Sequence, residues 1–162
     1  SGNTTDWIHY DFKTFQPLFS IIKSGEVPVL AFCGGHQLIA LAYDGKCDAI
    51  RNLNPGEPEV AEWAPGHFAE VGFTPLTIVK DDPLFEGLGK QPIFFESHYW
   101  EVKELPDEFE VLASTVQVRV QVLKHKAAPV YGTQFHPEVN NEEHPDGLRL
   151  LQNFFRIAGI ER

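Results

Sequence analysis

The sequence of 162 residues has no methionine, only two cysteines and no long apolar run. A helix that spans a membrane needs about 20 consecutive apolar residues, and no stretch approaches that length. Residues 1–30 also lack the basic and then apolar pattern of a secretory signal. These absences predict a cytoplasmic protein with no membrane partner. Because the cytoplasm keeps thiols reduced, we expect no disulfide between Cys33 and Cys47.

Positive charge is scarce as well. The sequence has 13 Lys and Arg residues against 23 Asp and Glu residues, which gives a formal net charge of -10. Such an acidic surface repels nucleic acids and anionic membranes at long range. We therefore expect no nucleic acid among the partners of this protein, and small molecules or other proteins instead.

Apolar periodicity divides the chain into helix-like and strand-like segments, with no internal repeat and no long linker. With 43% hydrophobic residues, residues 1–162 are expected to form one domain. The pattern predicts an α/β fold with three layers and a small antiparallel section. Strands are expected at residues 28–32, 71–79, 92–102, 108–115, 116–124 and 130–135, and residues 46–70 should be mostly loop. Helices are expected in the second half of 6–24, over 36–43 and over 146–158.

The last of these helices has the clearest apolar pattern. Asp146 is a plausible N-cap and Gly159 a stop signal. The spacing predicts one buried face that contains Leu148, Leu151, Phe154, Phe155 and Ala158.

The segment PVLAFCGGHQLIA, residues 28–40, places Cys33 between an apolar run and a helical pattern. A nucleophile at this point projects from a tight turn, and small neighbours such as Ala31 and Gly35 let the strand and helix approach each other. The helix N-terminus favours a thiolate and then an oxyanion, for which the Gly34 N–H is the natural donor. A free cysteine can also be a small buried residue. This segment alone leaves both interpretations open.

A second motif, QFHPE at residues 134–138, follows the last expected strand. On an extended backbone, side chains two residues apart point the same way, so Glu138 can orient the His136 ring and stabilise its imidazolium. Pro137 has no N–H for a ladder, which suits the point where a strand leaves its sheet. By itself the motif is weak, because surface loops often contain it.

Together, AFCGGHQ and the later FHPE resemble the class I glutamine amidotransferases, a family that uses a Cys-His-Glu triad. ESHYWEV at residues 96–102 resembles the family's Ser-His segment beside the glutamine pocket, and DGLRLLQNFFRIAG resembles its closing helix. The likeness covers nearly the whole chain. Within the family it is nearest to the glutaminase domain of GMP synthase and its stand-alone homologues. It implies a flavodoxin-like fold and no cofactor.

The resemblance implies a role for each matching residue. Cys33 would attack the side-chain amide of glutamine and form a thioester, His136 would move the proton, and Glu138 would orient His136. Ammonia would pass to a separate synthase subunit. The other implied site residues are Gly34 with Asn3 or Gly2 for the oxyanion, and Gln37, Ser97, His98 and Tyr99 for the substrate.

The beginning of the chain departs most from the family. Residues 1–3 resemble a Ser-Gly-Gly segment of the oxyanion site, but the strands and helix that usually precede it are missing. Because the chain has no methionine, Ser1 is not a retained start, and we expect a processed or truncated beginning. An exposed sheet edge would follow, with either self-association into a homo-oligomer or a loss of activity. Gly34 and Trp100 also replace a larger aliphatic residue and an aspartate, respectively.

Several alternatives therefore stay open. The same triad could hydrolyse γ-glutamyl amides or peptides, or the chain could be a non-catalytic domain that keeps the fold for binding. His36, three residues after Cys33, is a rival base for which the sequence offers no orienting carboxylate. Neither Cys33 with His36 nor His136 with Glu138 and His144 follows a usual zinc spacing, so no metal is expected.

Overall fold

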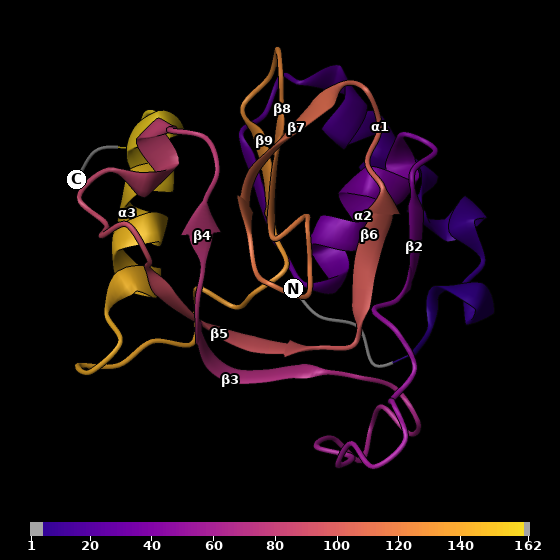
Figure 1. Ribbon diagram of the computed structural model, residues 1–162. Coiled ribbons are helices and arrows are strands. Elements are labelled where there is room, and N and C mark those ends of the chain that lie inside the picture. Colours follow the sequence, from indigo (N-terminus) through magenta and orange to yellow (C-terminus); the bar gives the residue numbers. More distant parts are fainter. Residues whose placement is uncertain (1–4, 161–162) are drawn as a thin grey trace.

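The computed structural model describes residues 5–160. Its centre is a sheet of five strands, β1 (Val29–Phe32), β4 (Thr77–Ile78), β7 (Phe109–Ser114), β8 (Val122–His125) and β9 (Val130–Thr133). Their spatial order is β1-β9-β8-β7-β4 (Figure 1). β1 and β9 are parallel, whereas the other neighbours are antiparallel. Within the described residues β1 has one neighbour only and forms an edge.

Helices cover both faces of this sheet. α1 (Gln16–Ser24) and α2 (Gly34–Ala42) lie on one side and α3 (Asp146–Ile157) lies on the other (Figure 1). This arrangement confirms the predicted three-layer α/β fold. None of the helices in residues 5–160 has both the length and the apolar character that crossing a bilayer requires.

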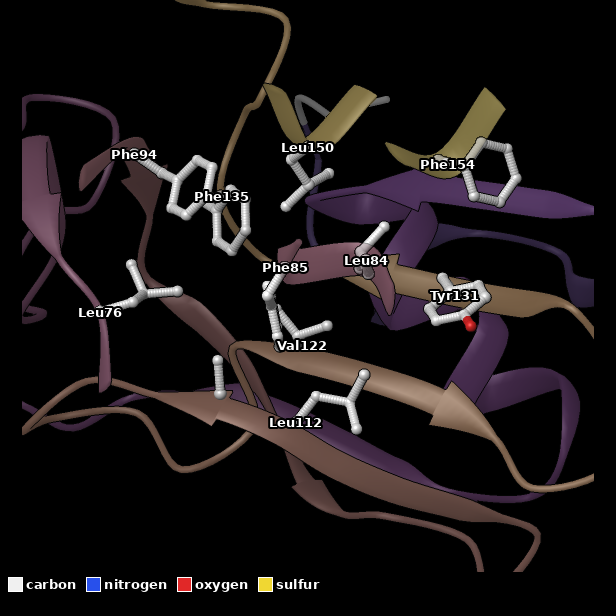
Figure 2. Packing of buried hydrophobic residues seen from close by; sticks show 11 residues of the cluster. Leu76, Leu84, Phe85, Phe94, Leu112, Val122, Tyr131, Phe135, Leu150 and Phe154 are labelled. Atoms are coloured by element: carbon white, nitrogen blue, oxygen red, sulfur yellow. The ribbon is translucent and has the colours of Figure 1, made fainter. Parts of the chain in front are cut away.

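Two buried clusters hold the layers together. Successive residues of a strand point to opposite faces, so adjacent positions of β8 enter different clusters. Leu123 packs with Ile39 of α2 on one face. On the other face, Val122 and Tyr131 pack with Leu150 of α3 (Figure 2). Burying each such aliphatic side chain contributes roughly 1.5–3 kcal/mol.

Two antiparallel pairs form the small additional section that the sequence predicts. β3 (Glu70–Pro75) pairs with β5 (Ile93–His98), and β2 (Lys46–Ala49) pairs with β6 (Trp100–Glu104). The expected strands at 71–79 and 92–102 are thus each divided, at Leu76 and at Tyr99. The two halves of each stretch pair with different partners, which periodicity cannot show. β2 also occupies the start of the expected loop at 46–70.

The expected strand at 116–124 is wrong over most of its length, because pairing begins only at Val122. Thr115 and Val118 instead close a tight turn: Thr115 N donates to Val118 O at 2.9 Å, and Val118 N donates to Thr115 Oγ1 at 3.0 Å. Val118 and Val120 are nevertheless fully buried. Their alternation therefore reflects burial of one side of an irregular segment and not a ladder.

The N-terminal region confirms a helix in the second half of residues 6–24. Two 3₁₀ turns, η1 (Trp7–His9) and η2 (Phe12–Phe15), precede α1. Pro17 lies in the first turn of α1, where its missing N–H costs no helical hydrogen bond. Gly25, at a φ of 65°, ends the helix in the left-handed conformation.

α3 differs from its prediction at its beginning. Asp146 is the first helical residue and Pro145 occupies the N-cap position, so the expected N-cap is wrong. The Asp146 carboxylate instead accepts a hydrogen bond of 2.8 Å from Ile93 N and ties α3 to β5. Asp146 thus bonds to a distant strand and not to the N–H groups at the start of its own helix.

The predicted buried face of α3 is also wrong in part. Leu150 and Phe154 are buried, but Leu148 and Phe155 are about half exposed. Both sets follow helical spacing, so the sequence could not distinguish them. The choice depends on how α3 docks against η3 (Pro83–Phe85) and β5.

Gly147 allows a close approach between α3 and the loop after β9. A Cβ built at Gly147 would lie 2.3 Å from Pro137 O, much less than any van der Waals contact. Pro137 separates His136 from Glu138, so this glycine lets α3 support the loop that carries both side chains.

We predict that Gly147→Ala lowers the free energy of unfolding by about 1–3 kcal/mol, because the backbone of one element must move. In an open helical position the same change would stabilise by up to about 1 kcal/mol. Urea unfolding followed by circular dichroism measures the effect. Gly89→Ala is the matched control, since a Cβ there meets no atom within 4 Å. If the two variants were equally stable, the loop at Pro137 could move away from α3 without a cost in stability, and the prediction would be wrong.

Candidate active site

Cys33 joins β1 to α2 in a strained backbone conformation. Its φ of 49° and ψ of -110° are unusual for a residue with a Cβ. Cys33 N donates to Thr133 O at 2.8 Å, which holds the end of β1 against β9, and Cys33 O accepts from Gln37 N at 3.1 Å inside the new helix. This turn, at the tip of the half-buried edge strand β1, is the geometry predicted for a nucleophile.

A cavity of about 340 Å³ opens beside Cys33. All four residues expected to hold a substrate line it. Its described lining residues are Thr5, Asp6, Cys33, Gln37, Trp63, Ser97, His98, Tyr99 and Trp100. A larger hollow of about 710 Å³ lies at residues 78–90, but its described lining contains no cysteine or histidine. Of these two cavities, the smaller one therefore holds the predicted nucleophile.

The thiol of Cys33 is held in its protonated form. Burial raises its pKa to about 11, and the carboxylates of Glu96 and Glu138 act in the same direction. The N–H of Gly34 opposes them by donating toward the sulfur. The role of Gly34 as an oxyanion donor stays a prediction. Cys47, the other free cysteine, has a pKa raised to about 12, first by burial.

His136 and Glu138 are brought together as predicted. His136 Nδ1 lies 2.9 Å from Glu138 Oε1. The His136 side chain is 16% exposed and that of Glu138 is 36% exposed, so the pair sits near the surface. Neither residue belongs to the described lining of the cavity beside Cys33.

Strand β5 connects this pair to Cys33. Phe95 O accepts a 2.9 Å hydrogen bond from His136 N, and Ser97 O lies 4.0 Å from Cys33 Sγ. Carbonyls two residues apart point the same way along a strand and are separated by roughly 7 Å. The backbone of His136 and the sulfur of Cys33 therefore meet the same edge of β5 at carbonyls two residues apart.

Gln37 lines the cavity, but its amide is engaged within the protein. Its Nε2 donates to Trp100 O at 3.1 Å and to Gln134 Oε1 at 3.0 Å, and its Oε1 accepts from Trp7 Nε1 at 2.7 Å. Both amide protons are used, so only an oxygen lone pair is left for a ligand. Gln37 thus links α2 to the segments that carry Trp7, Trp100 and Gln134.

The ring of His98 is likewise committed to the protein. Nδ1 lies 2.9 Å from Trp100 O, and Nε2 lies 3.1 Å from Glu70 Oε2 and 3.0 Å from Glu96 Oε2. A carbonyl only accepts, so Nδ1 carries a proton, and Nε2 needs a second proton to bridge carboxylates. Burial alone would lower the pKa of His98, but the two carboxylates outweigh burial and raise it to about 10.

These three side chains form the cluster that could hold a metal. One ligand atom from each of Glu70, Glu96 and His98 lies within 4.8 Å of the others. However, the proton on His98 already pairs the carboxylates, and Glu70 accepts from Thr115 Oγ1 and Gln121 Nε2, both at 2.6 Å. Hydrogen bonds thus engage Glu70, whereas the buried Glu96 is balanced by its ion pair with the charged His98 ring and its oxygens accept no hydrogen bond within the described residues. We assign no metal to the cluster.

Sequence reasoning missed three residues that line the cavity, namely Thr5, Asp6 and Trp63. Asp6 accepts a hydrogen bond from the Tyr99 hydroxyl, and the ring of Trp63 lies 5.9 Å from that of Tyr99. Asp6 lies in an aromatic-rich segment and Trp63 in a loop with several prolines. Nothing local marks either residue, because the contacts that matter are distant in the chain.

The remaining expectations concern His36 and Asn3. His36 is fully buried, and burial lowers its pKa to about 3, so it is a poor rival for the base. Its ring packs against β9, where a Cβ at Gly132 would lie 2.8 Å from Nδ1. Gly2 and Asn3, the candidates for the second oxyanion donor, lie outside the described residues.

Comparison with known proteins extends these observations. The sequence model of the family "Glutamine amidotransferase class-I" matches residues 10–158. A glutamine-hydrolyzing GMP synthase subunit of Methanothermobacter thermautotrophicus is 40% identical over 137 residues, which are 85% of this chain and 64% of that protein. The same subunit of Methanocaldococcus jannaschii is 35% identical over 93% of this chain and 71% of its own length. The chain thus spans roughly two thirds of these relatives.

Solved structures agree on the fold. A crystal structure described as a GMP synthase subunit from Thermoplasma acidophilum matches with a TM-score of 0.72 at 29% identity and covers 91% of this chain and 65% of that one. A glutamine amidotransferase from Thermotoga maritima matches with a TM-score of 0.63 at 19% identity, over 97% of this chain and 58% of that one. With a family match over most of its length and a strained cysteine at the predicted turn, this chain belongs to the class I glutamine amidotransferases.

Proposed function

We propose that this protein hydrolyses the side-chain amide of glutamine to glutamate and ammonia through a thioester on Cys33. The observation that carries the proposal is the position of Cys33. Its sulfur lines a cavity at the N-terminus of α2 and lies beside Ser97 O of β5. The backbone of His136, whose ring is bonded to Glu138, meets the same edge of β5 at Phe95 O.

His136 would act as the base in the first step. Its Nδ1 faces Glu138, so a proton on Nδ1 leaves the lone pair of Nε2 free to accept the thiol proton. The sulfur then attacks the amide carbon, and the oxyanion of the tetrahedral intermediate accepts a hydrogen bond from the Gly34 N–H. When the C–N bond breaks, the imidazolium returns its proton to the leaving nitrogen and ammonia departs.

The second step would reverse these roles. Water loses a proton to His136 and attacks the thioester carbon, and the C–S bond breaks to give glutamate and the thiol. Glu138 stabilises the imidazolium in both steps. Because a pKa of about 11 leaves little thiolate at neutral pH, transfer to His136 must accompany substrate binding.

The ammonia would serve a second protein. The matched relatives are each named as one subunit of a GMP synthase, which implies that their enzyme has at least one other. We infer that this chain likewise supplies ammonia to a separate synthase subunit. γ-Glutamyl amides are a second class of substrate, and a comparison of their turnover with that of glutamine separates the two.

A second candidate is a domain that binds glutamine but does not turn it over alone. The raised thiol pKa and the absence of His136 from the described cavity lining favour it. Ammonia release by the isolated chain distinguishes this candidate from the hydrolase.

We predict that a chloroketone analogue of glutamine alkylates Cys33 and leaves Cys47 unmodified, as measured by mass spectrometry of peptides. His136→Ala should slow this alkylation roughly a hundredfold or more, because the base is lost. The exposed His9 provides the matched control, and His9→Ala should label at the wild-type rate. Equal labelling of both cysteines, or no effect of His136→Ala, would refute the assigned nucleophile and base.

We further predict that Glu96→Gln lowers the pKa of Cys33. The carboxylate opposes the thiolate, and the amide has the same shape without the charge. At a fixed pH below the thiol pKa, iodoacetamide should react roughly two to ten times faster with this variant. The pH dependence of the rate gives the pKa directly. Glu110→Gln, at a surface pair with Lys80, should leave it unchanged; an unaltered pKa in folded Glu96→Gln protein would contradict the electrostatic coupling.

A further inference from the structure

The cavity beside Cys33 has one carboxylate among its described lining residues, and it belongs to Asp6. The other charged group at the cavity, the His98 ring, is already held between Glu70 and Glu96. The rest of the described lining is aromatic or uncharged. Among the described lining residues, the charge that no opposite charge pairs is therefore the negative charge of Asp6.

The backbone of Asp6 is fixed relative to the nucleophile. Asp6 directly precedes η1, and Asp6 O accepts a 3.0 Å hydrogen bond from His9 N in that turn. The next residue, Trp7, is buried and donates from Nε1 to Gln37 Oε1 at 2.7 Å. Gln37 belongs to α2, the helix that begins directly after Cys33. The backbone that carries the Asp6 carboxylate is therefore linked to α2, the helix that follows Cys33.

One oxygen of the Asp6 carboxylate has capacity for a ligand. Oδ1 accepts from the Tyr99 hydroxyl, whereas Oδ2 has no hydrogen-bond partner within residues 5–160. No lysine or arginine in that range pairs with Asp6. A cationic donor from a ligand would form a charge-assisted hydrogen bond in a partly dry cavity, where such bonds are strong. The Tyr99 and Trp63 rings, 5.9 Å apart, also favour a cation at their faces.

The substrate of the proposed reaction carries such a cation. The α-nitrogen of glutamine is four bonds from the amide carbon, so both groups must fit in the same cavity of about 340 Å³ when the carbon is at Cys33. We propose that Asp6 binds the α-ammonium group and so restricts the substrates to γ-glutamyl compounds with a free α-amino group. This inference rests on the proposed function, because it takes the amide to be placed at Cys33.

Binding measurements test this role separately from turnover. In a Cys33→Ser background, which removes the nucleophile, calorimetry gives the affinities for glutamine and for glutaramate, the same molecule without its α-amino group. Adding Asp6→Asn should weaken glutamine binding about tenfold to a hundredfold. The affinity for glutaramate should stay within about twofold, because that ligand has no cation to lose.

Two variants control for structural effects. Asp6→Glu keeps the charge and should retain a clear preference for glutamine over glutaramate. Asp11→Asn makes the same change of charge in the same segment, where the side chain only accepts from Lys13 N at 3.0 Å, and should alter neither affinity. Circular dichroism confirms that each variant is folded.

The outcomes separate this inference from the proposed function. The role of Asp6 would be overturned by an equal loss of affinity for both ligands, by an unchanged affinity for glutamine, or by a complete absence of glutamine binding. If Asp6-dependent binding is found but the protein with Cys33 releases no ammonia, hydrolysis fails and the role of Asp6 stands. If ammonia release shows the same preference for glutamine over glutaramate with and without Asp6→Asn, the role of Asp6 fails while hydrolysis stands.

Discussion

The parallel pairing of β1 with β9 is the constraint on which the site depends. It joins segments about a hundred residues apart, and the hydrogen bond from Cys33 N to Thr133 O is its last rung. Parallel strands end at the same edge of a sheet, so the chain after β1 and the chain after β9 emerge together. Cys33 leaves at one point and His136 at the other. Without this pairing the strained turn at Cys33 would lose the hydrogen bond that fixes it to the sheet.

Burial and charge oppose each other around the sulfur. Burial strengthens a hydrogen bond to a developing oxyanion, but it also raises the pKa of the Cys33 thiol to about 11. Glu96 adds to this effect and is itself paired with the protonated ring of His98. The Cys33 thiol therefore keeps its proton in the resting state. The structure favours proton transfer to a nearby base during the reaction over a thiolate that is present before substrate binds.

Much of the fold could be predicted because some signals are local. The apolar runs of β1 and β9, the small residues after Cys33 and the glycine after α1 depend only on near neighbours. Predictions that involved a distant partner were less secure: Asp146 binds Ile93 N and not its own helix, and the segment before Val122 turns at Thr115. Asp6 and Trp63 enter the cavity from segments with no motif.

By itself the sequence determined which groups can react and where along the chain the backbone changes from strand to helix, because side-chain chemistry and short-range spacing are written locally. Tertiary structure alone decided which of those groups share a cavity, which are already bonded to the protein and which stay protonated. His98 illustrates the difference: its motif predicted a contact with substrate, whereas two carboxylates and a carbonyl occupy both ring nitrogens. Solvation and distant charges set these properties, and both arise only when the chain is packed.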